Sequence, residues 1–198
     1  MKKSIVFTLL LSVFLFGSCT KCHNNNKEDI PVTDTVLTVT VEDIISNDIE
    51  AMKTKDLKEF VWFETMVLLN NYLDEECDGS YQEIVNVFQG TSTINENPVV
   101  YKFQHFADGN FMQDSVDGFW VEDCILEDSL INIPYSEAFD LIMQVNYPKP
   151  HSKNAVLRNP LGPVKINPQW CFGNIDAQLW VDAFTGEVNT SNPAFPKE

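Results

Sequence analysis

The stretch VVYKFQHFADGNFMQDSVDGFWVEDCIL, residues 99–126, decides which kind of fold this chain adopts. Three segments in it, 99–106, 111–116 and 119–126, are rich in aromatic and β-branched residues, as strands are. The dipeptides Asp108-Gly109 and Asp117-Gly118 separate them and favour the positive φ angles of tight hairpin turns. The stretch therefore predicts a meander of three antiparallel strands.

Helical patterns precede this meander. Residues 42–76 contain neither proline nor glycine, and their apolar residues fall near helical spacing, interrupted at Glu64. We expect one long helix there, or two helices that break near Thr54. Ser80-Tyr81-Gln82-Glu83 matches a capping box and predicts a further helix that ends at Gly90.

The same order follows in the second half. Ser136 begins a predicted helix that runs to about Asn146, and strand-like segments follow at 154–158, 169–172 and 178–183. The sequence thus predicts an α+β fold with helices packed on one face of an antiparallel sheet. We expect two helix-plus-three-strand units in tandem, an acidic one over 35–130 and a second over 131–198.

Charge separates these halves and excludes some partners. The net charge is −16, and residues 42–130 hold 20 acidic and 4 basic side chains, against 6 and 5 in residues 131–198. Such a field repels nucleic acid, so we expect no nucleic-acid partner. Solubility explains the acidic surface more simply than a basic partner does.

The C-terminal half contains a recurring pattern. Ser136-Glu137-Ala138 opens the predicted helix, Gln169-Trp170-Cys171-Phe172 forms a strand, and residues 179–188, LWVDAFTGEV, form a hairpin in which Asp182 caps the turn and Gly186 takes positive φ. From about Ile131 to Val188 the chain resembles the PepSY-like domains of exported bacterial proteins. The resemblance implies binding, as in inhibition or regulation of secreted proteases, and two such units in tandem would resemble β-lactamase inhibitor proteins.

The N-terminal residues have the layout of an export signal that ends at a cysteine. Lys2 and Lys3 precede an apolar run too short to span a bilayer, and the run ends at Gly17-Ser18-Cys19. This pattern resembles the lipobox of bacterial lipoproteins. It implies a signal peptide over 1–18, a lipid on Cys19 that anchors the protein to the membrane, and a flexible tether over 19–34. Thr20 is not the aspartate associated with inner-membrane retention, so we expect the outer membrane.

Two other uses of the cysteines stay open. Cys19-Thr20-Lys21-Cys22-His23 matches the attachment motif of c-type haem, but lipidation would consume Cys19, and the polar residues that follow offer no apolar pocket. Cys22, Cys77, Cys124 and Cys171 allow three full disulfide pairings. The histidines are far apart in sequence, so we expect no metal site and no cofactor.

Function is weighed between binding and catalysis. No nucleophile motif marks His151-Ser152 or any cysteine-histidine pair, so a non-catalytic binding or protease-inhibitor-like module is favoured over an exported hydrolase with an unrecognised site. The partner is an unidentified envelope or secreted protein. Trp62 and Phe63 are the candidate contact residues, because the run 60–63 is too apolar for one helix face.

Overall fold

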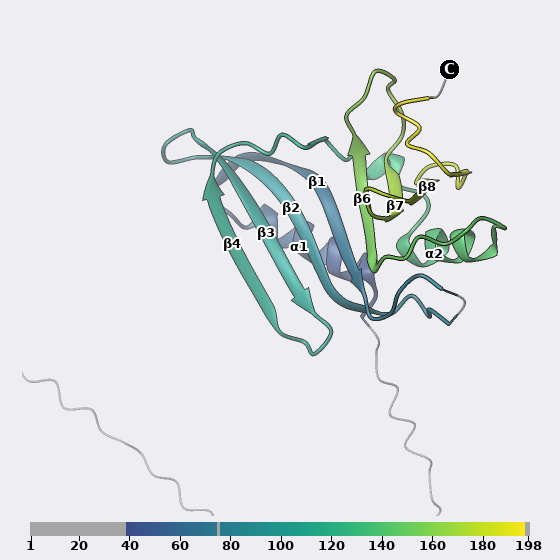
Figure 1. The fold of residues 1–198 in the computed structure, drawn as a ribbon. Coiled ribbons are helices and arrows are strands. Elements are labelled where there is room, and N and C mark those ends of the chain that lie inside the picture. Colours follow the sequence, from purple (N-terminus) through teal and green to yellow (C-terminus); the bar gives the residue numbers. More distant parts are fainter. Residues whose placement is uncertain (1–38, 75, 197–198) are drawn as a thin grey trace, which may run out of the picture. The chain divides into compact units, whose positions relative to one another are not determined.

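One antiparallel sheet forms the centre of the computed structural model, which describes residues 39–74 and 76–196 (Figure 1). The first half contributes β1 (Leu57–Leu69), β2 (Tyr81–Ser92), β3 (Pro98–Phe106) and β4 (Phe111–Asp117). The second half contributes β6 (Asn154–Pro160), β7 (Gln169–Gly173), β8 (Gln178–Asp182) and β9 (Val188–Asn189). The order is β4-β3-β2-β1-β6-β7-β8-β9, and the short β5 (Asp123–Cys124) pairs with β6. The halves therefore meet where β1 pairs with β6.

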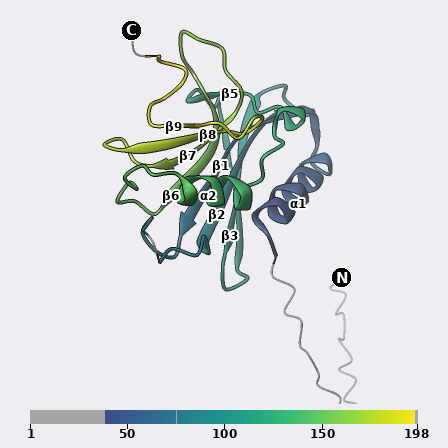
Figure 2. The ribbon, with the colours of Figure 1, turned by 90° about the vertical axis from the view of Figure 1, so that its right-hand side faces the viewer.

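Each half begins with a helix, α1 (Val41–Lys53) or α2 (Tyr135–Gln144), and a 3₁₀ turn, η1 (Asp128–Leu130), precedes α2 (Figure 2). α1 begins with a capping box formed by Thr40 and Asp43. The Asp43 amide donates to Oγ1 of Thr40 over 3.1 Å, and the Thr40 amide donates to Oδ2 of Asp43 over 3.1 Å. This reciprocal pair satisfies two amides that the first turn leaves free.

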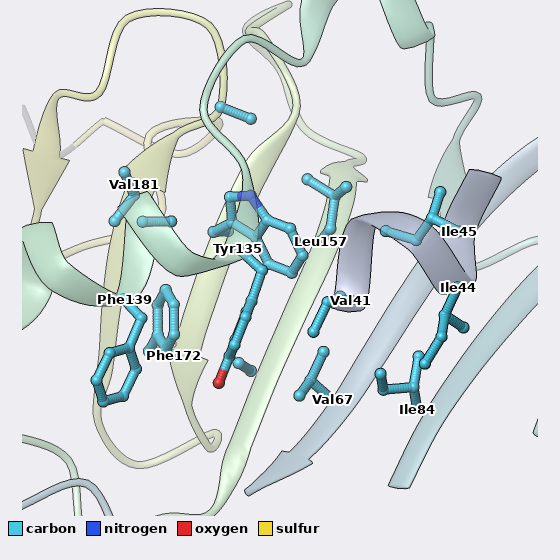
Figure 3. Packing of buried hydrophobic residues seen from close by; sticks show 14 of the residues in the cluster. Val41, Ile44, Ile45, Val67, Ile84, Tyr135, Phe139, Leu157, Phe172 and Val181 are labelled. Carbon is cyan, nitrogen blue, oxygen red and sulfur yellow. The ribbon is translucent and has the colours of Figure 1, made fainter. Parts of the chain in front are cut away.

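Both helices pack on the same face of the sheet and share one core. Figure 3 shows Ile44 of α1 facing Ile84, while Phe139 of α2 lies beside Phe172. Tyr135 joins the helix to the sheet, because its ring lies 5.5 Å from that of Trp170 and its hydroxyl donates to the Gly79 carbonyl over 2.8 Å. Neither of the two described helices lies on the other face, and α1 lies behind the strands in Figure 1.

The long helix predicted over 42–76 is wrong beyond Thr54. The chain leaves α1 at Lys53 and enters β1 at Leu57. From Trp62 to Leu69, β1 is buried or half-buried on both faces. A central strand of this kind has a nearly continuous apolar run, which periodicity alone does not distinguish from a buried helix.

The helix predicted over 81–90 is wrong as well, because these residues form β2. Ser80 does not cap a helix: its amide and hydroxyl both donate to Oδ1 of Asp78, over 3.0 and 2.6 Å. Gly90 ends no helix either. It lies in the strand, where a Cβ would come within 2.6 Å of Leu57.

The predicted meander is partly confirmed. The β3–β4 hairpin forms as expected, with Gly109 at φ 85° in its turn. The segment 119–126 does not pair with β4; only Asp123 and Cys124 are in a strand, and they pair with β6. In the second half α2, β6, β7 and β8 agree with the predicted segments within a few residues.

The fold class is α+β, as predicted, but the protein is mostly sheet. The two halves do not stand as separate helix-plus-three-strand units. Each adds four strands to one continuous sheet, since β1 and β6 pair over five residues from Glu64↔Arg158 to Leu68↔Asn154.

Candidate functional site

The helix-free face of the sheet has a hollow over its middle strands. Its volume is about 330 Å³, and β1, β2, β6 and β7 line it. The strand register places Val85, Met66 and Val156 side by side in this hollow. Glu83 and Asn154 add polar groups next to them. The hollow is therefore an apolar surface with polar neighbours.

A row of polar side chains crosses the sheet beside the hollow. Glu64, Arg158, Gln169 and Asp182 pair in succession across β1, β6, β7 and β8. Glu64 is only 6% exposed and Gln169 only 1%. Burying such groups is costly unless they are hydrogen-bonded, so the row needs partners.

The segment that follows β4 supplies one of these partners. The Arg158 guanidinium donates from Nε to Oδ1 of Asp123 over 2.6 Å. The Trp120 amide donates to Oε1 of Gln89 over 2.7 Å, and the Leu126 amide donates to the Trp62 carbonyl over 2.8 Å. These contacts hold residues 120–126 against the sheet.

Hydrogen bonding around the row is nevertheless incomplete. Among residues 39–74 and 76–196, four buried side-chain atoms have no hydrogen-bond partner: Nε1 of Trp120, Oδ2 of Asp123, Oε1 of Gln169 and Nε1 of Trp180. All four residues lie in this region: Gln169 in the row, Trp120 and Asp123 in the segment 120–126 that covers it, and Trp180 at the next position of β8 on the same face. Unsatisfied buried groups are rare, so they distinguish this region from an ordinary core.

The electrostatics of the row centre on Glu64. Burial, and then the nearby charge of Asp123, raise the pKa of its carboxyl to about 7, although Arg158 acts in the opposite direction. Burial also raises the pKa of Asp123, against the lowering effect of Arg158. Burial first, and then the second carboxyl group, that of Asp123, therefore favour the protonated form of Glu64.

The predicted contact residues Trp62 and Phe63 lie in the interior. They are 6% and 7% exposed, in a strand rather than a helix. The Trp62 ring stacks on Phe88, and its Nε1 donates to the Glu64 carbonyl over 3.1 Å. The run 60–63 is apolar because both faces of β1 are covered, so the structure gives no exposed patch there.

The three cysteines that the structure describes form no disulfide with one another. Cys77, Cys124 and Cys171 are free thiols, and every full pairing with Cys22 would need a bond between two of them. Burial raises the pKa of Cys77 and raises that of Cys171 to about 12, so these two thiols stay protonated and unreactive at neutral pH. Cys19, Cys22 and His23, on which the lipid and haem hypotheses rest, lie outside the described residues.

The two described histidines, His105 and His151, have structural partners. Nε2 of His105 lies 2.9 Å from both carboxylate oxygens of Asp48, and Asn86 donates from Nδ2 to Oδ2 of Asp48 over 2.7 Å. These bonds join α1 to β2 and β3. His151 stacks on Tyr72 at 4.1 Å between ring centroids. In the part of the chain that the structure describes, no group of three or more His, Cys, Asp or Glu is placed to hold a metal ion.

Sequence reasoning missed the polar row. Glu64 was visible as the one charge in the apolar run 60–69. A charge at a core position of a strand is a signal of a buried polar site. The contact of Arg158 with Asp123 spans 35 residues of sequence and had no local signal.

Comparison with known proteins finds no match to this chain. No family model matches the chain, and neither a curated protein nor a solved structure matches it. Within the described residues, no helix has the length and apolar character needed to cross a membrane.

Proposed function

We propose that this protein is a lipid-anchored, non-catalytic binding module of the cell envelope, which holds a protein partner on the helix-free face of its sheet. The hollow between β2, β1, β6 and β7 is the observation that carries the proposal. The opposite face is filled by α1 and α2, whereas Met66, Leu68, Val85 and Val156 stay partly accessible here. An apolar centre with polar neighbours is the usual anatomy of a protein interface.

The partner class follows from the sequence resemblance. PepSY-like domains are associated with inhibition or regulation of secreted proteases, so we propose a protease-inhibitor-like role. The chain order supports this, because a helix followed by four strands occurs twice, as α1 with β1–β4 and α2 with β6–β9. We propose that the halves are two related units fused through β1 and β6.

The cellular place rests on the N-terminal sequence. We propose that residues 1–18 are removed and that Cys19 carries the lipid in the outer membrane, with 19–34 as tether. Cys19→Ala should block maturation. Intact-mass spectrometry that finds an unacylated mature chain would contradict this part, and covalent haem absorbance would favour the haem alternative.

The partner surface is tested with a soluble form that lacks residues 1–19. Val85→Arg places a charge in the hollow and should abolish capture of the partner from envelope extract, as well as inhibition of an envelope protease. Ile94→Arg, at an exposed position in the β2–β3 turn, is the matched control and should change neither. Unaltered circular dichroism of both variants shows that the fold is kept. Equal capture by both variants would overturn the proposal.

An exported hydrolase is the second candidate, since the raised pKa of Glu64 suits acid–base chemistry. Glu64 is nearly inaccessible, however, and lies beside Arg158 in the row that the segment 120–126 covers. Turnover of a peptide, ester or glycan that Glu64→Gln abolishes would favour the hydrolase and sink the binding hypothesis.

A further inference from the structure

The outermost strand of the first half, β4, is a long and exposed sheet edge. β4 pairs with β3 over seven successive residues, from Val99↔Asp117 to His105↔Phe111, without a bulge. All seven residues of β4 are exposed, and no described strand pairs with its outer side. The opposite end of the sheet, in contrast, is β9, which has only two residues.

The backbone groups of β4 that face outward follow from its hydrogen bonds. The Gly118 amide donates to the Pro98 carbonyl, and the Asn110 carbonyl accepts from Phe106, so even-numbered residues bond to β3. Antiparallel pairing alternates, so the amides and carbonyls of Phe111, Gln113 and Ser115 point away from the sheet. The Asp114 carboxylate accepts from the Ser115 amide over 2.8 Å, which is consistent with that amide facing outward.

Edge strands are usually protected by charged side chains, above all lysine, by proline, by a bulge or by short length. β4 has no lysine, proline or bulge, and its only charges are the acidic Asp114 and Asp117, which a basic partner would neutralise. On the helix-free side Met112 and Val116, each 59% exposed, flank Asp114. A strand beside β4 would therefore meet an apolar, an acidic and a second apolar side chain in turn.

We propose that an extended, basic segment of a partner protein adds to the outer edge of β4 as a further strand. The segment alternates so that apolar, basic and apolar side chains lie beside Met112, Asp114 and Val116. Main-chain hydrogen bonds to residues 111–117 provide affinity, and the basic side chain provides selectivity. A second copy is a poorer occupant, because each chain carries a net charge of −16. The inference rests on the proposed binding function, but it uses a surface other than the hollow.

A seven-residue probe peptide tests this edge. Its sequence is Thr-Val-Thr-Lys-Thr-Val-Thr, and the control peptide has glutamate in place of the lysine. Hydrogen exchange followed by NMR should show slower exchange at the Gln113 and Ser115 amides with the lysine peptide, and no change at Met112 and Asp114. Asp114→Lys should weaken the lysine peptide about tenfold and tighten the glutamate peptide.

Two substitutions at one position test the backbone contribution. Gln113→Pro removes an outward amide without touching the β3 pairing and should abolish peptide binding, whereas Gln113→Ala keeps the amide and should bind normally. The inference is refuted if millimolar peptide slows exchange at no amide of β4, or only at the amides of Met66 and Val85. It is also refuted if the protein forms a dimer that Gln113→Pro dissociates, because the occupant of the edge would then be a second copy. Capture of the envelope partner separates the two surfaces. If Val85→Arg abolishes this capture while Asp114→Lys and Gln113→Pro leave it unchanged, binding in the hollow is supported and the inference about the β4 edge is wrong.

Discussion

Arg158 of β6 donates from Nε to Oδ1 of Asp123 over 2.6 Å, and the Asp123 side chain is completely buried. This bond holds the segment 120–126 against the polar row of Glu64, Arg158, Gln169 and Asp182. It also balances the charges of Glu64 and Asp123, which lie beside it. Its loss should therefore change both the stability of the fold and the attachment of that segment.

Asp123→Ala should destabilise the protein by roughly 1–3 kcal/mol, because Arg158 loses the hydrogen bond to its buried partner. Urea unfolding measures this change. Glu122→Ala, at the exposed neighbouring position, is the control and should leave the midpoint nearly unchanged. Similar midpoints for the two variants would show that the Arg158–Asp123 bond contributes nothing to stability.

Glu64 should make stability depend on pH. Burial, and then Asp123, raise its folded pKa from 4.5 to about 7, so between these values the folded protein holds a proton that the unfolded chain releases. The free energy of unfolding therefore falls as pH rises from about 4.5 to about 7 and then levels off. Glu64→Gln should flatten this fall and stabilise the protein at pH 8 by about 1–3 kcal/mol.

The control for this change is Glu59→Gln, at an exposed position of the same strand. It should keep the pH dependence of the unmodified protein. Urea titrations at several pH values measure both variants. A Glu64→Gln protein whose stability falls with pH as steeply as before would show that another group titrates.

The sequence predicted the second half of the fold better than the first. β6, β7 and β8 are short, bounded by proline or glycine, and follow a helix with one clear apolar face, so local signals suffice. β1 and β2 are central strands that are mostly buried or half-buried on both faces, and there apolar spacing resembles that of a helix. The pairing of β1 with β6 depends on residues about ninety apart, which no local pattern reveals.

The candidate site was less predictable still. The turn at Asp182 formed as expected, since its Oδ1 accepts from the Phe184 and Thr185 amides and Gly186 has φ 78°. The hollow and the polar row, however, exist only because β1 and β6 are neighbours. Trp62 was singled out for its apolar surroundings, which proved to be those of a core strand.

Gly173 should tolerate no side chain. It has φ 133°, and a Cβ would lie 2.2 Å from the Ala177 carbonyl oxygen in the β7–β8 hairpin. Gly173→Ala should cost about 2–4 kcal/mol, from steric overlap and backbone strain together. Gly109→Ala is the matched control, because φ is 85° there but nothing lies within 4 Å; it should cost only about 1–2 kcal/mol. Equal thermal midpoints would contradict this steric argument.

Asp48 should contribute to the stability of the fold, because its carboxylate on α1 accepts hydrogen bonds from both β2 and β3. It is buried and receives hydrogen bonds from Asn86 and from His105, and Asn86 in turn accepts from the Thr65 hydroxyl. Asp48→Ala leaves the buried Asn86 amide without an acceptor and should cost about 2–3 kcal/mol. Asp48→Asn keeps one oxygen at the same place and should cost less.

The matched control for Asp48 is Glu50→Ala on the same helix, which removes only an exposed contact with Lys53 and should have little effect. Urea unfolding ranks the three variants, and amide exchange in α1 shows where stability is lost. Because Asp48 joins the helix to the sheet, exchange in α1 should rise more than exchange in β7 and β8. An Asp48→Ala protein as stable as the Glu50→Ala protein would mean that apolar packing alone holds α1 on the sheet.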